Sequence, residues 1–93
     1  MEHSIADACV GMEKIFFFDD ITQSLCEISD LHGNMKVLAV NDNKFFESGN
    51  IFFDRGNLYV ASRRSLDLLK YDGHSKTIKT ISQRDIAINQ NGL

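Results

Sequence analysis

Short apolar runs separated by turn residues follow one another along the second half of the chain. Residues 58–62, LYVAS, are rich in the β-branched and aromatic residues that favour strands, and residues 66–71 form a second apolar run. Asp72 and Gly73 are typical of a tight hairpin turn, and a third run follows at 77–82. Parallel strands would need a crossover of about a dozen residues, so these short connections predict an antiparallel meander.

The same pattern of apolar positions occurs upstream, displaced by 43 residues without a gap. Ile15 falls on Leu58 and Leu25 on Leu68, although few residues are identical. A partial third match places Ile51 on Ile86, with an offset of 35 residues. The offsets differ by 8 residues, which indicates a longer link within the stretch VNDNKFFE.

Internal periods of about 40 to 45 residues, with four strands in each, are typical of β-propeller blades. We therefore predict an all-β protein whose antiparallel four-stranded meanders resemble two blades, within one domain over residues 1–93. The first repeat covers about 6–49, with strands at 7–10, 14–19, 25–29 and 35–40. The second covers about 50–84, with strands at 50–54, 58–62, 66–71 and 77–82. A spare strand follows within 85–93, at 85–89.

The amino end permits a second interpretation. Ser4 and Asp7 form a weak capping pair, and the apolar residues from Ile5 to Met12 include several at helical spacing. A short helix over residues 4–12 is therefore an alternative to the first strand. In that case the spare strand would complete the first meander.

Several motifs resemble known propeller repeats. DRGNLYVAS, LLKYDG and KTIKTI are similar to the NHL and SMP-30-like repeats, and KIFFFDD followed by SLCEISDLHGN resembles the YWTD repeats, with Phe17 and Phe18 in place of Trp-Thr. The resemblance implies a propeller fold that binds other molecules. It does not imply one particular activity, because this fold carries many functions.

Two strands are apolar on both faces, at residues 15–18 and 58–61. This pattern predicts sheets that are covered on both sides. Two blades alone would expose two broad apolar faces, and repeat folds usually need at least about three units. We therefore expect a homo-oligomer or a larger propeller. Three copies of two blades would give a ring of six, in which the spare strand could be exchanged between subunits.

Composition restricts which partners and which cellular compartment we expect. The net charge of −3 and the pI near 5.5 argue against a nucleic-acid partner, because phosphate binding needs clustered positive charge. No apolar run approaches the roughly 20 residues that span a bilayer, and the amino end does not resemble a signal peptide. We expect a cytoplasmic protein without a membrane partner. Cys9 and Cys26 are predicted on the first and third strands, too far apart for a disulfide bond.

Charged residues at equivalent loops are the candidate binding residues. Asp19 and Asp20 follow the second strand of the first repeat, whereas Arg63 and Arg64 follow the second strand of the second repeat. Alternating blades would place these opposite charges near one another. The simpler interpretation is solvated loop charge, which contributes only about 0 to 1 kcal/mol per exposed pair.

Catalytic patterns are sparse. The three histidines are scattered, no catalytic or metal-binding motif with fixed spacing is present, and no cofactor is expected. The resemblance to SMP-30-like propellers implies a metal bound by strand-end residues, here Asp54 and Asn89, with Gly11 at the equivalent position of the first repeat. Capping of a turn is the simpler role for Asp54.

The sequence thus favours a non-catalytic binding module whose partner is a protein or a small ligand. One alternative is a fragment of a metal-dependent lactonase-type propeller enzyme. Another is a small monomeric β-sandwich or barrel that acts as an inhibitor or adaptor.

Overall fold

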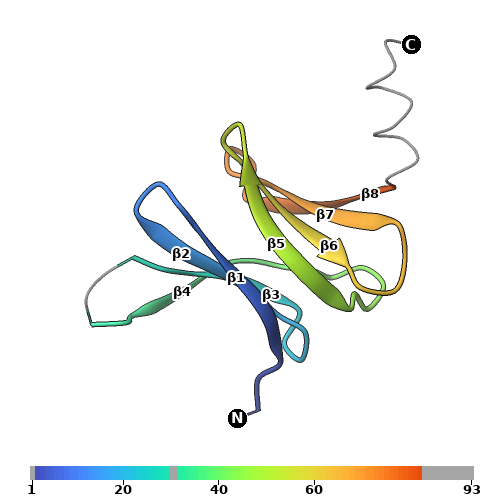
Figure 1. The fold of residues 1–93 in the computed structure, drawn as a ribbon, viewed down its shortest axis with the longest axis horizontal. Helices are drawn as coiled ribbons and strands as arrows, with labels where there is room; N and C mark the ends of the chain where they lie inside the picture. The colour runs from blue at the N-terminus through green and yellow to red at the C-terminus, as the bar shows by residue number, and fades with distance from the viewer. Residues whose placement is uncertain (1, 30–31, 83–93) are drawn as a thin grey trace.

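The computed structural model describes residues 2–29 and 32–82, and it consists of two antiparallel four-stranded sheets. Figure 1 shows them side by side, and each strand pairs with its neighbour in the sequence. Sheet A contains β1 (Ile5–Gly11), β2 (Lys14–Asp19), β3 (Ser24–Ile28) and β4 (Met35–Val40). Sheet B contains β5 (Ser48–Asp54), β6 (Asn57–Ser62), β7 (Asp67–Asp72) and β8 (Thr77–Ser82). The predicted all-β class and the two four-stranded meanders are confirmed.

The first hairpin of each sheet turns through two residues with positive φ. These are Met12 (49°) and Glu13 (63°) in sheet A, and Arg55 (51°) and Gly56 (81°) in sheet B. Two consecutive positive φ values match a type I′ turn, whose twist suits a two-residue hairpin loop. Gly56 adopts this conformation without a steric penalty, whereas Glu13 carries a Cβ atom that the left-handed region disfavours.

The two sheets repeat one another residue by residue. Ala8 pairs with Phe17 in sheet A, and Ile51, 43 positions later, pairs with Val60 in sheet B. The register irregularity between Ile5 and Ala8 recurs at the equivalent place in β5. The offset holds through β2–β3 and β6–β7, and it ends at an irregularity in β3–β4 that β7–β8 lacks. The ungapped offset that the sequence predicts is therefore the structural repeat.

The hydrophobic core lies between the sheets. Strand side chains alternate between the two faces, so each sheet directs every second residue toward the other. The inner faces and the link at 41–47 supply the buried cluster: Phe16, Phe18, Leu25, Phe46, Ile51, Leu58, Val60 and Leu69. Phe18 meets Phe46 edge to face, with ring centroids 6.1 Å apart.

The first strands of the two sheets, β1 and β5, run next to each other. Gly11 permits this approach, because a Cβ atom there would lie 2.9 Å from Cγ of Phe53. The carboxylate of Asp7 accepts a hydrogen bond from the backbone N–H of Ile51 at 3.1 Å. The contact between β1 and β5 therefore consists of the Phe53 ring packed on Gly11 and the hydrogen bond of Asp7.

The link between the sheets, residues 41–47, is held by Gln23. Its amide nitrogen donates to the backbone oxygens of Asp20 (2.7 Å) and Phe46 (2.9 Å), and its Oε1 accepts from the backbone N–H of Phe46 (3.0 Å). Asn41 donates to the same Oε1 at 2.9 Å. The longer link predicted in this stretch is thus an ordered connection.

The alternative helix over residues 4–12 is wrong. Cys9 of β1 packs against the core while Val10 points outward, so the chain follows the two-residue period of a strand. Cys9 and Cys26 are free, on strands separated by β2, as the sequence predicts. The predicted strand at 85–89 and Asn89 lie outside the described residues.

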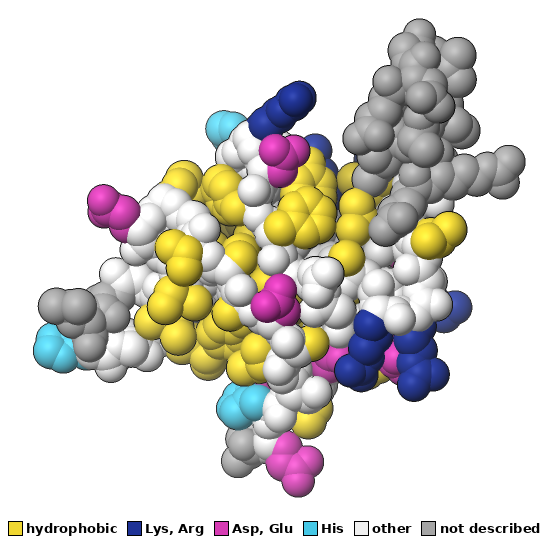
Figure 2. All heavy atoms as spheres, viewed as in Figure 1, with side chains coloured by type: hydrophobic (Ala, Val, Ile, Leu, Met, Phe, Trp, Pro, Cys, Tyr) yellow, Lys and Arg dark blue, Asp and Glu magenta, His cyan; other side chains and the backbone are white. Residues whose placement is uncertain are grey.

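The outer face of sheet A is apolar and open. Its exposed members include Val10 (73% exposed), Met35 (52%) and Val37 (48%). Figure 2 shows hydrophobic side chains gathered over this sheet. Within the described chain, no helix is long and apolar enough to cross a membrane.

Candidate binding site between the two sheets

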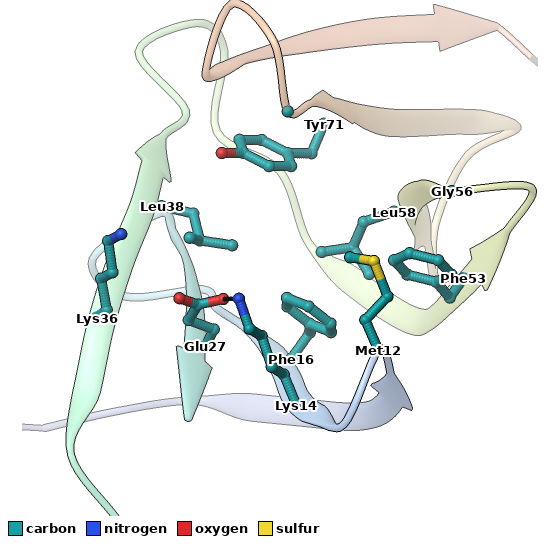
Figure 3. A pocket seen from close by; sticks show the side chains of 11 residues that line it. Met12, Lys14, Phe16, Glu27, Lys36, Leu38, Phe53, Gly56, Leu58 and Tyr71 are labelled. Carbon is teal, nitrogen blue, oxygen red and sulfur yellow. Dashed lines mark ion pairs between the residues drawn. The ribbon is translucent and has the colours of Figure 1, made fainter. Parts of the chain in front are cut away.

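A pocket of about 210 Å³ lies between the sheets, at the end where β1 turns into β2 (Figure 3). Both sheets supply its walls, so it exists only because they pack together. Eleven residues line it: Met12, Lys14, Phe16, Glu27, Lys36, Leu38, Phe53, Gly56, Leu58, Tyr71 and Gly73. Its volume suits a small molecule rather than a peptide.

Aromatic and aliphatic side chains form the inner wall. Phe16 of β2 and Phe53 of β5 are stacked, with ring centroids 6.0 Å apart and planes inclined by 19°. Leu58 belongs to the buried core, and Leu38 packs against it. This part of the pocket favours the apolar body of a ligand.

The opposite wall carries charge. Glu27 projects from β3 and is only 6% exposed, and its carboxylate lies 3.4 Å from Nζ of Lys14. Lys36 pairs across the strands with Glu27, and Figure 3 shows its side chain beside the same wall. Lys36 forms no ion pair within residues 2–29 and 32–82. Lys36 therefore adds a second positive charge beside the buried Glu27.

Tyr71 of β7 adds a hydroxyl group from sheet B. Burial raises the pKa of this phenol, and the negative charges of Glu27 and Asp72 raise it further. Tyr71 therefore stays protonated at neutral pH and can donate a hydrogen bond. Together with Lys36, it could orient a small ligand that carries a carboxylate on an apolar body.

Asp19, a predicted binding residue, lies at the other end of the sheets and is buried. One of its oxygens accepts from Nδ1 of His3 at 2.5 Å, and the other accepts from the backbone N–H groups of Ser4 and Ile21. Burial by itself would raise the pKa of Asp19, but these hydrogen bonds lower it to about 2. Its role in the described structure is to hold the amino-terminal segment on the β2–β3 turn.

Asp20, the second predicted acid, joins the two sheets. It is only 4% exposed, and both of its oxygens accept from the backbone N–H of Ser48, at 3.1 and 3.2 Å. The Ser48 hydroxyl donates to the same carboxylate. The interpretation of Asp19 and Asp20 as solvated loop charge is wrong, because both carboxylates are buried and accept hydrogen bonds from backbone N–H groups distant in sequence, that of Ser4 for Asp19 and that of Ser48 for Asp20.

The two arginines predicted as binding residues lie near the predicted Asp20. Arg63 is 3.7 Å from Asp20 and 3.5 Å from Glu47, and Arg64 pairs with Glu47. The expected approach of opposite charges from the two repeats is thus seen for Asp20 and Arg63. Asp20, Glu47, Arg63 and Arg64 thus form one charged cluster. Both arginine side chains are largely exposed, so they form its solvent-facing rim.

The possible metal ligand Asp54 is exposed at the end of β5. Gly11 is its equivalent in sheet A, as the sequence offset predicts. Among the described residues, no group of three or more His, Cys, Asp or Glu side chains could hold a metal ion.

Sequence reasoning missed the pocket residues Lys14, Glu27, Lys36 and Tyr71. One signal was present: in the buried strand SLCEI, the charged Glu27 follows the apolar residues Leu25 and Cys26 and precedes Ile28. A charge in such a place needs a partner. Comparisons with family models, with curated proteins and with solved structures found no match.

Proposed function

We propose that this protein is a non-catalytic binding module built from two blade-like sheets, and that further sheets of the same kind complete it. The outer face of sheet A carries the proposal. Its exposed side chains Val10, Ile15, Met35 and Val37 are apolar and lie close together on one sheet surface. Contiguous apolar surface of this type is typical of an interface.

The repeat supports the same proposal. Sheet A and sheet B share their strand order and most of their register, which differs at the irregularity in β3–β4, and they pack face to face through an apolar core. Blades of a propeller stack in this way, and stacking covers both faces of every sheet. The resemblance of the sequence to NHL, SMP-30-like and YWTD repeats agrees with this architecture.

The mass in solution tests the proposal. We expect light scattering coupled to size-exclusion chromatography to give an average mass above the 10.5 kDa of one chain. This average mass should rise with protein concentration. A monomer at every concentration, with a single cooperative melting transition, would refute completion by further copies. That result would favour the small self-contained β-sandwich.

The pocket favours a second candidate function, the binding of a small anionic ligand. In Figure 3 the hydroxyl of Tyr71 points toward β4, which carries Lys36, whereas Phe16, Phe53 and Leu58 lie on the other side of the pocket. Benzoate is a suitable probe, because it combines one ring with one carboxylate. We expect benzoate to shift the amide NMR signals of Tyr71 and Leu58, and we expect Lys36→Gln to weaken these shifts.

Lys79→Gln provides the matched control. Lys79 is the equivalent of Lys36 in sheet B, but it does not line the pocket. If both substitutions change the benzoate response equally, the effect is one of net charge and the pocket does not bind this ligand class.

A further inference from the structure

Each sheet has two faces, and the 43-residue offset relates the faces of sheet A to those of sheet B. The inner face of sheet A, with Phe16 and Phe18, corresponds to the outer face of sheet B, with Tyr59 and Ala61. The inner face of sheet B, with Val60, corresponds to the outer face of sheet A. The two outer faces are therefore the counterparts of the two faces that already pack together inside the chain.

We infer that these outer faces bind each other between copies, so that sheet B of one molecule packs on sheet A of the next, head to tail. This inference rests on the proposed function and adds the polarity and the residue pairing of the contact. The partner is a second copy of this chain, placed as sheet B is placed on sheet A within one molecule.

The outer face of sheet A has the composition that such a contact requires. Two rows cross the sheet, one through Val10, Ile15, Ile28 and Met35, and the other through Ala8, Phe17, Cys26 and Val37. All eight residues are apolar, but Phe17 and Cys26 are already buried, so a partner would cover mainly Val10, Ile15, Met35 and Val37. At the end of this face, the carboxylate of Asp19 is paired with His3. A partner that covers these rows would bury no unpaired charge from them.

Side-chain sizes agree with the pairing. Inside the chain, Phe18 of sheet A and Val60 of sheet B share the core. Their counterparts between copies are Ala61 and Phe17, so one aromatic ring again meets one small side chain, with the ring now supplied by the other face. Ala61 has two carbon atoms fewer than Val60, so this contact between copies buries less apolar area than the internal one.

A second size exchange occurs beside β1. Gly11 lies against the ring of Phe53, and their counterparts are Asp54 and Val10. The smaller Val10 leaves space for the longer side chain of Asp54. Both pairs sit at the end of a strand, where a carboxylate can remain hydrated.

The polar contact between β1 and β5 also has a counterpart. Asp7 accepts from the backbone N–H of Ile51 at 3.1 Å. The equivalent residues are Asn50 and Ala8, and Asn50 retains a side-chain oxygen that can accept from the N–H of Ala8 in the next copy. One acceptor is thus present at the same place in both repeats.

The contact between Asp20 and Ser48 has no such counterpart. Its equivalents are Arg63 and Ile5, and Arg63 is already directed toward Asp20 and Glu47. The interface between copies therefore lacks this polar contact. We expect it to be weaker than the internal one and to dissociate on dilution.

Charge disfavours a contact between two sheet B faces. Lys70 and Lys79 pair across the strands on the outer face of sheet B. Two such faces together would bring four ammonium groups near one another. A sheet A partner offers apolar surface instead, along which lysine stems can pack while their charged ends stay in water.

The test mixes two variants that each block one face. Val10→Glu places a charge on the outer face of sheet A, and Ala61→Glu places one on the outer face of sheet B. If the contact is head to tail, each variant alone is monomeric by light scattering. Their equimolar mixture forms a dimer, because one intact face of each kind remains.

Leu66→Glu is the matched control. Leu66 is 67% exposed, much as Val10 is, but it lies in the β6–β7 turn outside both faces. We expect this variant to associate like the wild type. Circular dichroism verifies that each variant is folded, and Asn50→Ala, which alters no apolar residue, should weaken association several-fold.

The outcomes separate the inference from the function on which it rests. If the wild type associates but Val10→Glu or Ala61→Glu still self-associates alone, the contact joins like faces and the head-to-tail inference is wrong. If the wild type is a monomer at every concentration, association between copies is absent, and the proposed completion by further copies fails as well.

Discussion

Replacement of Asp20 by alanine should weaken the packing of the two sheets more than any change at the exposed rim of the same cluster. The carboxylate is buried and accepts from both the N–H and the hydroxyl of Ser48, which begins β5. Alanine leaves both donors without this acceptor. A buried donor without a partner costs about 1–3 kcal/mol, so we expect a total loss of about 2–6 kcal/mol for the two donors.

That loss is large for a chain of this length. Stability of roughly 0.05–0.15 kcal/mol per residue gives about 5–14 kcal/mol for the whole protein. Urea unfolding followed by circular dichroism measures the effect. With a slope of about 1–3 kcal/mol per molar urea, the midpoint should fall by about 1 M or more. All samples need the same low protein concentration, because association would add to the apparent stability.

Two variants serve as controls for Asp20→Ala. Arg63→Ala removes two ion pairs of a half-exposed side chain, 3.7 Å to Asp20 and 3.5 Å to Glu47, and it should cost about 1 kcal/mol. Ser48→Ala removes the hydroxyl but leaves the N–H bonded to Asp20, and it should cost about 1 kcal/mol. An Asp20→Ala midpoint equal to that of Arg63→Ala would falsify the role of Asp20 as the polar contact between the sheets.

Three further predictions concern the turns, the acid range and metal dependence. Glu13→Gly should raise the free energy of unfolding by about 1 kcal/mol, because φ is 63° at this position, whereas Gly56→Ala, at φ 81°, should lower it in the same urea assay. The folded-state pKa of Asp19 is about 2, below its ordinary value of 3.8, so Asp19 stabilises the fold above about pH 4 and this contribution disappears as the pH falls toward 2. The melting temperature should therefore depend less steeply on pH over that range for Asp19→Asn than for the wild type. An equally steep dependence for both proteins would contradict the lowered pKa of Asp19. EDTA should leave the melting temperature unchanged, and a lower value would support the metal-dependent alternative that involves Asp54.

The strands could be predicted because their signals are local. Asp72 and Gly73 mark a turn, and the apolar run before them marks a strand, without any knowledge of the partner sheet. The repeat then indicates the less obvious strands, since the 43-residue offset places β1 where β5 lies in the second repeat. The amino-terminal helix was a reasonable alternative, because residues at helical spacing can also alternate along a strand.

The pocket and the role of Asp20 could not be predicted in this way. Glu27 and Tyr71 come from different sheets, so their proximity follows from how the sheets pack. Asp20 is part of a loop and would be solvated in an isolated sheet, but the N–H of Ser48 reaches it from 28 positions away in the sequence. Charged loop residues can be judged only when the neighbouring sheet is known.

The neighbour-to-neighbour strand order has a consequence for how the chain folds. In sheet A the longest-range strand pairing joins Ser24 to Val40, so each sheet can form from local contacts, which favour rapid folding. Docking of the sheets is different, because the contact of Asp7 with Ile51 spans 44 positions. During synthesis, sheet A leaves the ribosome first, and Phe16 and Phe18 then face water until sheet B has formed. That interval is when a nascent chain is most exposed to pairing with the wrong sheet.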